Sequence, residues 1–169
     1  MTTFQEGVLT FTFDATADVQ KYDEWPFYKN QFCKSCTGSK AVDFVGLRNG
    51  DRDLWLIEVK DYRRHPRTKT ISIWDEIAVK ARDTLAGLLS TSTQSPHTYL
   101  EQTFARRAVR AAVIRIVFHL EQPRNPSKLF PQSFDPANLQ LRLRQSVRPI
   151  DPHARVVDRY SQNIFWNVV

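Results

Sequence analysis

Cysteine is scarce in this 169-residue sequence, which contains two such residues, Cys33 and Cys36. Their spacing is that of half a zinc ribbon or of a redox dithiol, but the second half of a ribbon is missing. A structural zinc ion needs further ligands, and the four histidines occur singly rather than in pairs at ligand spacing. We therefore interpret the two cysteines as reduced thiols in a loop, with zinc binding and a redox role as the alternatives.

Long apolar runs are also missing. No stretch of about eighteen apolar residues is present, so the sequence predicts no transmembrane helix and no membrane partner. The first thirteen residues lack the basic start followed by an apolar run that is typical of a secretory signal. We expect a cytoplasmic protein.

The composition is that of a globular protein with a basic balance. Hydrophobic residues make up 41% of the sequence and charged residues 25%, which argues against wholesale disorder. Lys and Arg number 24 against 18 Asp and Glu, and the formal net charge is +6. Such a balance favours a polyanionic partner. Many basic proteins bind no nucleic acid, however, so this prediction also requires a candidate site in the sequence.

Strands are predicted where polar and apolar residues alternate, or where short apolar runs lie between turn residues. These segments are 8–13, 41–47, 53–60 and 113–120. Asn49 and Gly50 lie between the second and the third, and Asn-Gly between apolar runs is typical of a β-hairpin. The last twenty residues are apolar enough to form a further strand or a packed closing segment.

Helices are predicted from other patterns. Over residues 72–90 the apolar residues recur at intervals of three and four, which predicts an amphipathic helix. A short helix broken by a proline is expected within residues 18–32, and another helix ends in the segment ARRAVR. Asp135-Pro136 is typical of an N-cap followed by proline, and favours a helix over 136–148, although the leucines there also alternate as in a strand.

Charged residues lie on strand faces that are otherwise apolar. In the third predicted strand alternate residues share a face, so Glu58 and Lys60 follow Leu54 and Leu56 on one side. Asp43 likewise shares a face with apolar residues of the neighbouring strand. Because buried unpaired charges are costly, such residues persist where they compensate one another or hold an ion.

A divalent cation satisfies this arrangement. Mg²⁺ prefers oxygen ligands, and the carboxylates of Asp43 and Glu58 with the main-chain carbonyl of Val59 supply one side of its octahedron. Mn²⁺ is expected to substitute for it. Lys60 would then contact the attacking water or a phosphate. The alternative is an ordinary ion pair between Glu58 and Lys60, with Asp43 paired to an arginine.

Asp43, fourteen intervening residues and then Glu58-Val59-Lys60 in a strand resemble the PD-(D/E)XK nuclease superfamily. Val42 stands where the family usually has proline. The resemblance implies an α/β fold with a restriction-endonuclease-like core, in which a central mixed β-sheet is flanked by helices. It also implies a Mg²⁺-dependent endonuclease that hydrolyses phosphodiester bonds, DNA rather than RNA, with Asp43, Glu58 and Lys60 as catalytic residues. Defence, repair and mobile-element processing are the roles such nucleases have.

The resemblance also bears on domain organisation and partners. We expect a single nuclease-like domain over 1–169, with its core at about 20–120 and residues 121–169 as a C-terminal extension packed on the core. A homodimer or a larger complex would supply specificity. The alternative function is a catalytically silent nuclease-like module that binds nucleic acid or a partner protein.

Further site residues follow from the same resemblance. In some relatives an acidic residue before the Asp strand completes the metal site, and Asp23 and Glu24 are the candidates, of which Glu24 is preferred. Lys80, on the predicted helix 72–90, is expected to face the site and bind nucleic acid. Basic residues directly after the motif are well placed to hold phosphates. These residues are Arg63, Arg64, Arg67 and Lys69.

Overall fold

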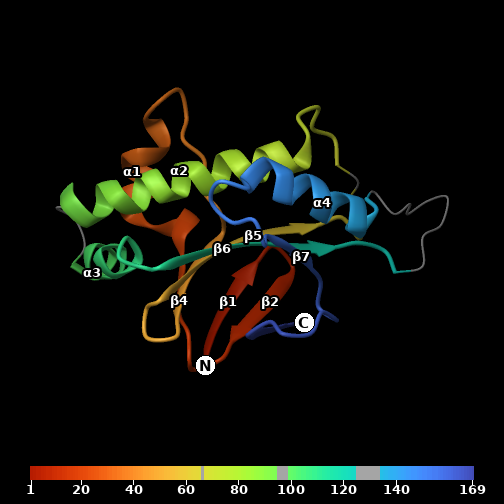
Figure 1. Ribbon diagram of the computed structural model, residues 1–169, viewed down its shortest axis with the longest axis horizontal. Coiled ribbons are helices and arrows are strands. Elements are labelled where there is room, and N and C mark those ends of the chain that lie inside the picture. Colours follow the sequence, from red (N-terminus) through yellow and green to blue (C-terminus); the bar gives the residue numbers. More distant parts are fainter. Residues whose placement is uncertain (66, 95–98, 125–133) are drawn as a thin grey trace.

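Two β-sheets and a layer of helices make up the computed structural model, which describes residues 1–65, 67–94, 99–124 and 134–169 (Figure 1). The larger sheet has the strand order β3-β4-β5-β6-β7 and the smaller one the order β1-β2-β8. The long helices cover one face of the larger sheet, and the smaller sheet packs against the other face. The predicted α/β class, with a central mixed sheet flanked by helices, is confirmed.

The larger sheet is mixed because its strands change direction halfway across. β3, β4 and β5 are antiparallel, whereas β5, β6 and β7 are parallel. The predicted hairpin joins β4 to β5, and Asn49 and Gly50 in its turn have φ values of 55° and 63°. The five strands are β3 (Asp18–Lys21), β4 (Phe44–Arg48), β5 (Asp53–Asp61), β6 (Val113–Glu121) and β7 (Arg155–Val157).

Helices fill the crossover between β5 and β6 and cover the sheet. Four α-helices occur in the described residues: α1 (Pro26–Asn30), α2 (Ile73–Gln94), α3 (Tyr99–Ala108) and α4 (Pro136–Val147). Short 3-10 turns, η1 (Tyr22–Glu24) and η2 (Phe32–Lys34), flank α1. The predicted amphipathic helix is therefore confirmed as α2. Its buried residues Ile77, Ala81 and Leu88 belong to the same hydrophobic core as Leu54 and Leu56 of β5.

Helix α4 settles the ambiguity between helix and strand near the C-terminal end. The Asp135 side chain accepts hydrogen bonds from the main-chain nitrogens of Ala137 and Asn138, at 3.3 and 3.1 Å. This is an N-cap, and it satisfies donors that the first turn of a helix leaves free. The helix predicted from Asp135-Pro136 is confirmed, and the strand alternative is wrong.

The smaller sheet joins both ends of the described chain to β2. It contains β1 (Thr2–Glu6), β2 (Leu9–Phe13) and β8 (Trp166–Val168), and β1 and β8 each pair with β2 in antiparallel fashion. The prediction that the last residues form a strand is confirmed. Phe11 and Phe13 of β2 are fully buried against the larger sheet.

The segment before β4 differs from the prediction. The expected strand 41–47 begins at Phe44, so Asp43 is the residue just before the strand.

No helix in the described part of the chain is long and apolar enough to cross a membrane.

Candidate functional site

Asp43 and Glu58 face each other where β4 begins and β5 ends. Phe44 pairs with Ile57, and continuing this register by one residue places Asp43 opposite Glu58. Asp43 Oδ2 accepts a hydrogen bond of 2.6 Å from the main-chain nitrogen of Val59. The exposed fractions are 5% for Asp43 and 1% for Glu58. The strand-face argument therefore located two buried carboxylates correctly.

Two lysines neutralise Glu58. Its Oε1 atom accepts hydrogen bonds from Lys60 Nζ and from Lys80 Nζ, the second at 2.6 Å. Lys80 comes from α2, so the helix closes over the end of β5 and turns this side chain toward the site. Lys60 Nζ also donates to the Val59 carbonyl at 3.0 Å, so the main-chain oxygen predicted to bind metal is already engaged. Glu58 Oε2 is buried and has no hydrogen-bond partner among the described residues.

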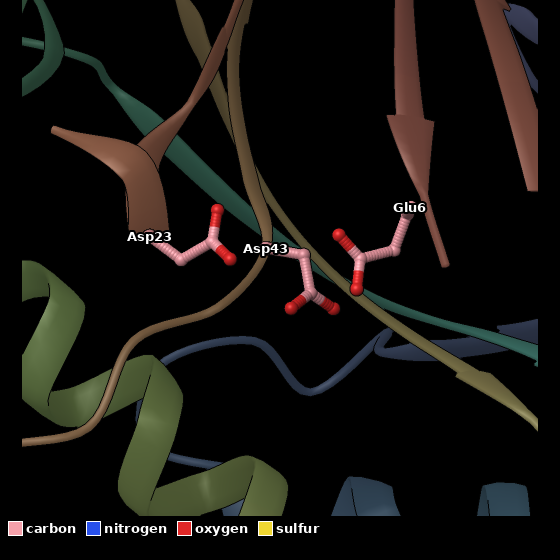
Figure 2. Close-up of side chains that lie close together, drawn as sticks. All are labelled: Glu6, Asp23 and Asp43. Carbon is pink, nitrogen blue, oxygen red and sulfur yellow. The ribbon is translucent and has the colours of Figure 1, made fainter.

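A second group of carboxylates gathers around Asp43. Figure 2 shows Glu6, Asp23 and Asp43 converging from β1, from η1 and from the start of β4. One carboxylate oxygen from each lies within 4.8 Å of the others. Lys21 Nζ lies 2.6 Å from Glu6 Oε2 and 3.5 Å from Asp23 Oδ1. We call Glu6, Asp23 and Asp43 the acidic cluster.

The two acidic residues proposed to complete the site have different positions. Asp23 belongs to the acidic cluster, and its Oδ1 atom is buried. The Glu24 side chain is 57% exposed, and its Oε1 atom lies 3.3 Å from Lys21 Nζ. The structure therefore brings Asp23, and not the preferred Glu24, toward Asp43.

Burial and neighbouring charges shift the pKa values of several residues of the site. Burial, together with the nearby charge of Glu58, raises the pKa of Asp43 to about 7, although Lys60 and Lys80 oppose this. Burial alone would lower the pKa of Lys60, but Glu58 and Asp43 outweigh it and raise this pKa. The pKa of Lys21 is raised in the same way, because its hydrogen bond with Glu6 and the charge of Asp23 outweigh burial. A cation bound at Asp43 would displace a proton at neutral pH.

The basic residues after β5 have different environments. Arg63 forms a two-point ion pair with the aspartate at the end of β5. Arg67 donates to Glu76 Oε2 at 2.7 Å, and its side chain is 9% exposed, so it anchors the loop to α2. Lys69 also contacts Glu76, at 2.5 Å, but remains exposed. Arg64 is exposed. Arg64 and Lys69 are therefore the two predicted phosphate-binding residues in this loop that are most accessible.

Both cysteines are free thiols. Cys33 Sγ donates a hydrogen bond of 3.1 Å to the Lys29 carbonyl, and Cys36 is exposed. Neither belongs to a group of potential metal ligands in the described ranges of the chain. Cys33 lies in η2 rather than in the expected loop, whereas Cys36 lies in the turn that follows.

Glu6 and Lys21 were not recognised as site residues from the sequence. Glu6 reaches Asp43 because β1 folds back on β2 at Gly7, which has a φ of 58°. Gly7 was a local signal of the turn in this hairpin. Nothing local in the sequence, however, indicates that its tip lies beside Asp43.

A bacterial tRNA ligase is similar to nearly the whole of this chain. The cysteine–tRNA ligase of Neisseria meningitidis serogroup A is 35% identical over 201 residues, which cover 99% of this chain and 28% of the ligase. The chain thus spans little more than a quarter of the length of that relative. No family model matches the sequence. No solved structure matches the chain.

This similarity overturns the interpretation drawn from the motif. The relative is a tRNA ligase and not a nuclease, so the predicted membership of the PD-(D/E)XK superfamily and the predicted Mg²⁺-dependent endonuclease activity are wrong. The physical reason is that Asp followed by Glu-x-Lys is a short pattern that arises by chance in many proteins. Ion pairs between buried acidic residues and lysines also explain why charged residues lie on apolar strand faces, and they require no hydrolytic chemistry.

Proposed function

We propose that this chain is a tRNA-binding module related to one part of a cysteine–tRNA ligase. The observation that carries the proposal is the 35% identity, along 99% of the chain, to a protein named for a tRNA substrate. The net charge of +6 supports a polyanionic partner. The same similarity favours RNA over the DNA expected from the motif, a cytoplasmic location, and a larger protein or complex as the source of specificity.

The loop after β5 is the proposed contact with the tRNA backbone. Arg64 and Lys69 are exposed there, within nine residues of Lys60 in the sequence. Exposed Arg and Lys side chains bind phosphates and release counterions, which makes the affinity depend on salt. Arg67 holds the loop on α2 and so limits the ordering cost of binding.

We also propose that the acidic cluster binds Mg²⁺, for which Mn²⁺ substitutes. The three converging carboxylates support this proposal, as does the buried Asp23 Oδ1 atom, which accepts no hydrogen bond from the described residues. Bound Mg²⁺ usually keeps several waters and is held by one or two carboxylates together with a phosphate oxygen. At this site it would supply a positive charge for an RNA phosphate. Asp23 and Asp43 would hold it, and Lys21 would neutralise Glu6.

Binding to tRNA is tested by fluorescence polarisation with labelled tRNA transcripts and with a DNA duplex of similar length. The double variant Arg64→Glu with Lys69→Glu should weaken tRNA binding about tenfold or more, and should lower the salt slope of log K by about two. The matched control is Arg52→Glu with Arg110→Glu. Both control arginines are exposed, and they lie at the opposite end of β5, where Ala112 donates to the Arg52 carbonyl.

The control should retain an affinity within about threefold of the wild type, because it changes the net charge equally but at a distant surface. Equal losses in the two double variants would contradict the assigned surface. A wild-type protein that does not bind tRNA, or that binds the DNA duplex more tightly, would contradict the proposed function.

Cation binding is tested separately by calorimetric titration with MnCl₂ in the absence of nucleic acid. Asp23→Asn should abolish the binding heat, whereas Glu24→Gln should keep it, because Glu24 lies outside the acidic cluster. The wild type should also release protons on binding at pH 7. Binding that is lost in the Glu24 variant and kept in the Asp23 variant would contradict the assigned ligands.

A further inference from the structure

A pocket of about 350 Å³ lies beside the candidate site, at the end of β6. It is bounded by that strand end, the start of α4 and the loop after β7, which meet at one end of the molecule (Figure 1). Leu120, in its wall, pairs with Lys60 of β5, so the pocket is one strand away from Glu58. Pro123 and Val156 add apolar surface. The volume suits a small ligand such as a nucleobase.

The rim of this pocket presents an aromatic ring to solvent. Tyr160 is 64% exposed, and the Arg124 guanidinium lies 4.8 Å from the centre of its ring. The loop that carries Tyr160 is tied in place, because Asp158 Oδ1 accepts hydrogen bonds from the Tyr160 main-chain nitrogen at 3.0 Å and from Ser161 Oγ at 2.8 Å. A fixed, exposed aromatic ring with an arginine beside it is suited to stacking with a base.

A buried carboxylate also lines the pocket. Glu121 is 3% exposed and accepts hydrogen bonds from Arg159 Nε at 2.8 Å and from His119 Nε2 at 3.0 Å. His119 Nδ1 accepts from Trp166 Nε1, so Nε2 carries the proton in the neutral ring. Burial opposes ionisation of Glu121, but these hydrogen bonds outweigh it and lower its pKa. Glu121 is therefore ionised, and its ion pair with Arg159 neutralises it and holds Arg159, the residue before Tyr160, against the end of β6.

Asp158 supplies a carboxylate with an available oxygen. Its Oδ1 atom is used within the loop, whereas its Oδ2 atom accepts no hydrogen bond from the described residues. This free carboxylate oxygen accepts a hydrogen bond from an amino group and repels a carbonyl oxygen. Adenine and cytosine carry such an amino group at their pairing edge, whereas uracil presents a carbonyl oxygen at the equivalent position.

We propose that this pocket binds an unpaired adenine or cytosine of RNA, with the base stacked on Tyr160 and its amino group directed to Asp158. Arg124 then contacts the adjoining phosphate. This inference rests on the proposed function, because an RNA partner supplies the ligand. It specifies which part of the RNA is bound, an unpaired base, and which pocket of the chain binds that base.

The test uses fluorescein-labelled hexaadenylate, hexacytidylate and hexauridylate with the full chain in a polarisation assay. Tyr160→Ala should weaken hexaadenylate and hexacytidylate binding about tenfold or more, since base stacking on an aromatic ring is lost. Tyr160→Phe keeps the ring and should retain an affinity within about twofold of the wild type. Tyr99→Ala, which removes a side chain that is 80% exposed on α3, is the matched control and should also retain binding. Asp158→Asn should reduce the preference over hexauridylate.

Each result bears on the pocket independently of the tRNA measurement. Unchanged hexanucleotide binding in Tyr160→Ala, or equal wild-type affinity for all three hexanucleotides, would overturn the inference. AMP or CMP binding as tight as the hexanucleotides would overturn the assignment to RNA. Hexanucleotide binding that depends on Tyr160, in a protein that does not bind tRNA, would support the pocket and overturn the proposed function. Binding of tRNA by a protein whose hexanucleotide binding does not depend on Tyr160 would overturn the pocket alone.

Discussion

Replacing Asp43 with asparagine should stabilise the protein at high pH and change it little at low pH. The folded protein raises the pKa of this carboxyl from 3.8 to about 7, so protonated Asp43 is favoured in the folded state. The unfolded chain ionises it near 3.8. Stability from this group is therefore fully present below pH 3.8 and is lost as the pH rises to about 7. Asparagine has no ionisable group, so the variant does not lose stability in this way.

The magnitude follows from the difference between the two pKa values. Because Asp43 is 5% exposed, solvent screens the effect little. The full difference corresponds to about 4 kcal/mol of unfolding free energy, of which about 2–3 kcal/mol falls between pH 5 and pH 8. Asparagine keeps an oxygen that accepts the hydrogen bond from the Val59 main-chain nitrogen. The variant should therefore fold normally.

Urea unfolding in EDTA at pH 5 and pH 8 measures this effect. The gain in unfolding free energy of Asp43→Asn over the wild type should be larger at pH 8 by about 2–3 kcal/mol. Asp61→Asn is the control. Burial opposes ionisation of Asp61, but hydrogen bonds from Arg63 lower its pKa, so its effect on stability should not change between these pH values. A gain from Asp43→Asn that is the same at both pH values would refute the reasoning.

Other predictions concern packing and the helix ends. Gly87→Ala should lower the unfolding free energy by about 1–2 kcal/mol despite the better helix propensity of alanine, because the new Cβ would lie 2.0 Å from the buried Tyr22 hydroxyl. Adding Tyr22→Phe should restore most of this loss, since that hydroxyl has no hydrogen-bond partner among the described residues; no recovery in thermal unfolding would contradict this account. Asp135→Ala should cost about 1 kcal/mol through loss of the N-cap of α4, whereas Asp135→Asn should cost little. Equal losses from the two, measured by urea unfolding, would show that the cap is not the cause.

The elements with complete local patterns were predictable from the sequence. The Asn49-Gly50 turn, the alternation along β5 and the cap at Asp135 each act within a few residues. β1 and β3 were not predicted. Both are short strands at the edges of their sheets, and neither shows the alternation of polar and apolar residues that predicts a strand. β3 is defined by its pairing with β4, which lies beyond α1 in the sequence.

The distinction between local patterns and long-range packing also explains which residues of the candidate site were predictable. The meeting of Asp43 and Glu58 was predictable, because strand alternation and one hairpin determine it. The contribution of Glu6 depends on a second sheet packing against the first, which the local sequence does not encode. The functional prediction was wrong for another reason: three residue types at a common spacing do not distinguish one chemistry from another.

The small sheet determines how the protein would respond to mechanical force. β1 and β8 are both antiparallel to β2, so they run parallel to each other on either side of it. Tension between residues 1 and 169 would pull these two strands in opposite directions along their length. The hydrogen bonds of the sheet, including the pair exchanged by Thr10 and Val169, would then be loaded together in shear rather than broken one at a time. Such a sheet resists stretching more than a hairpin opened from its end.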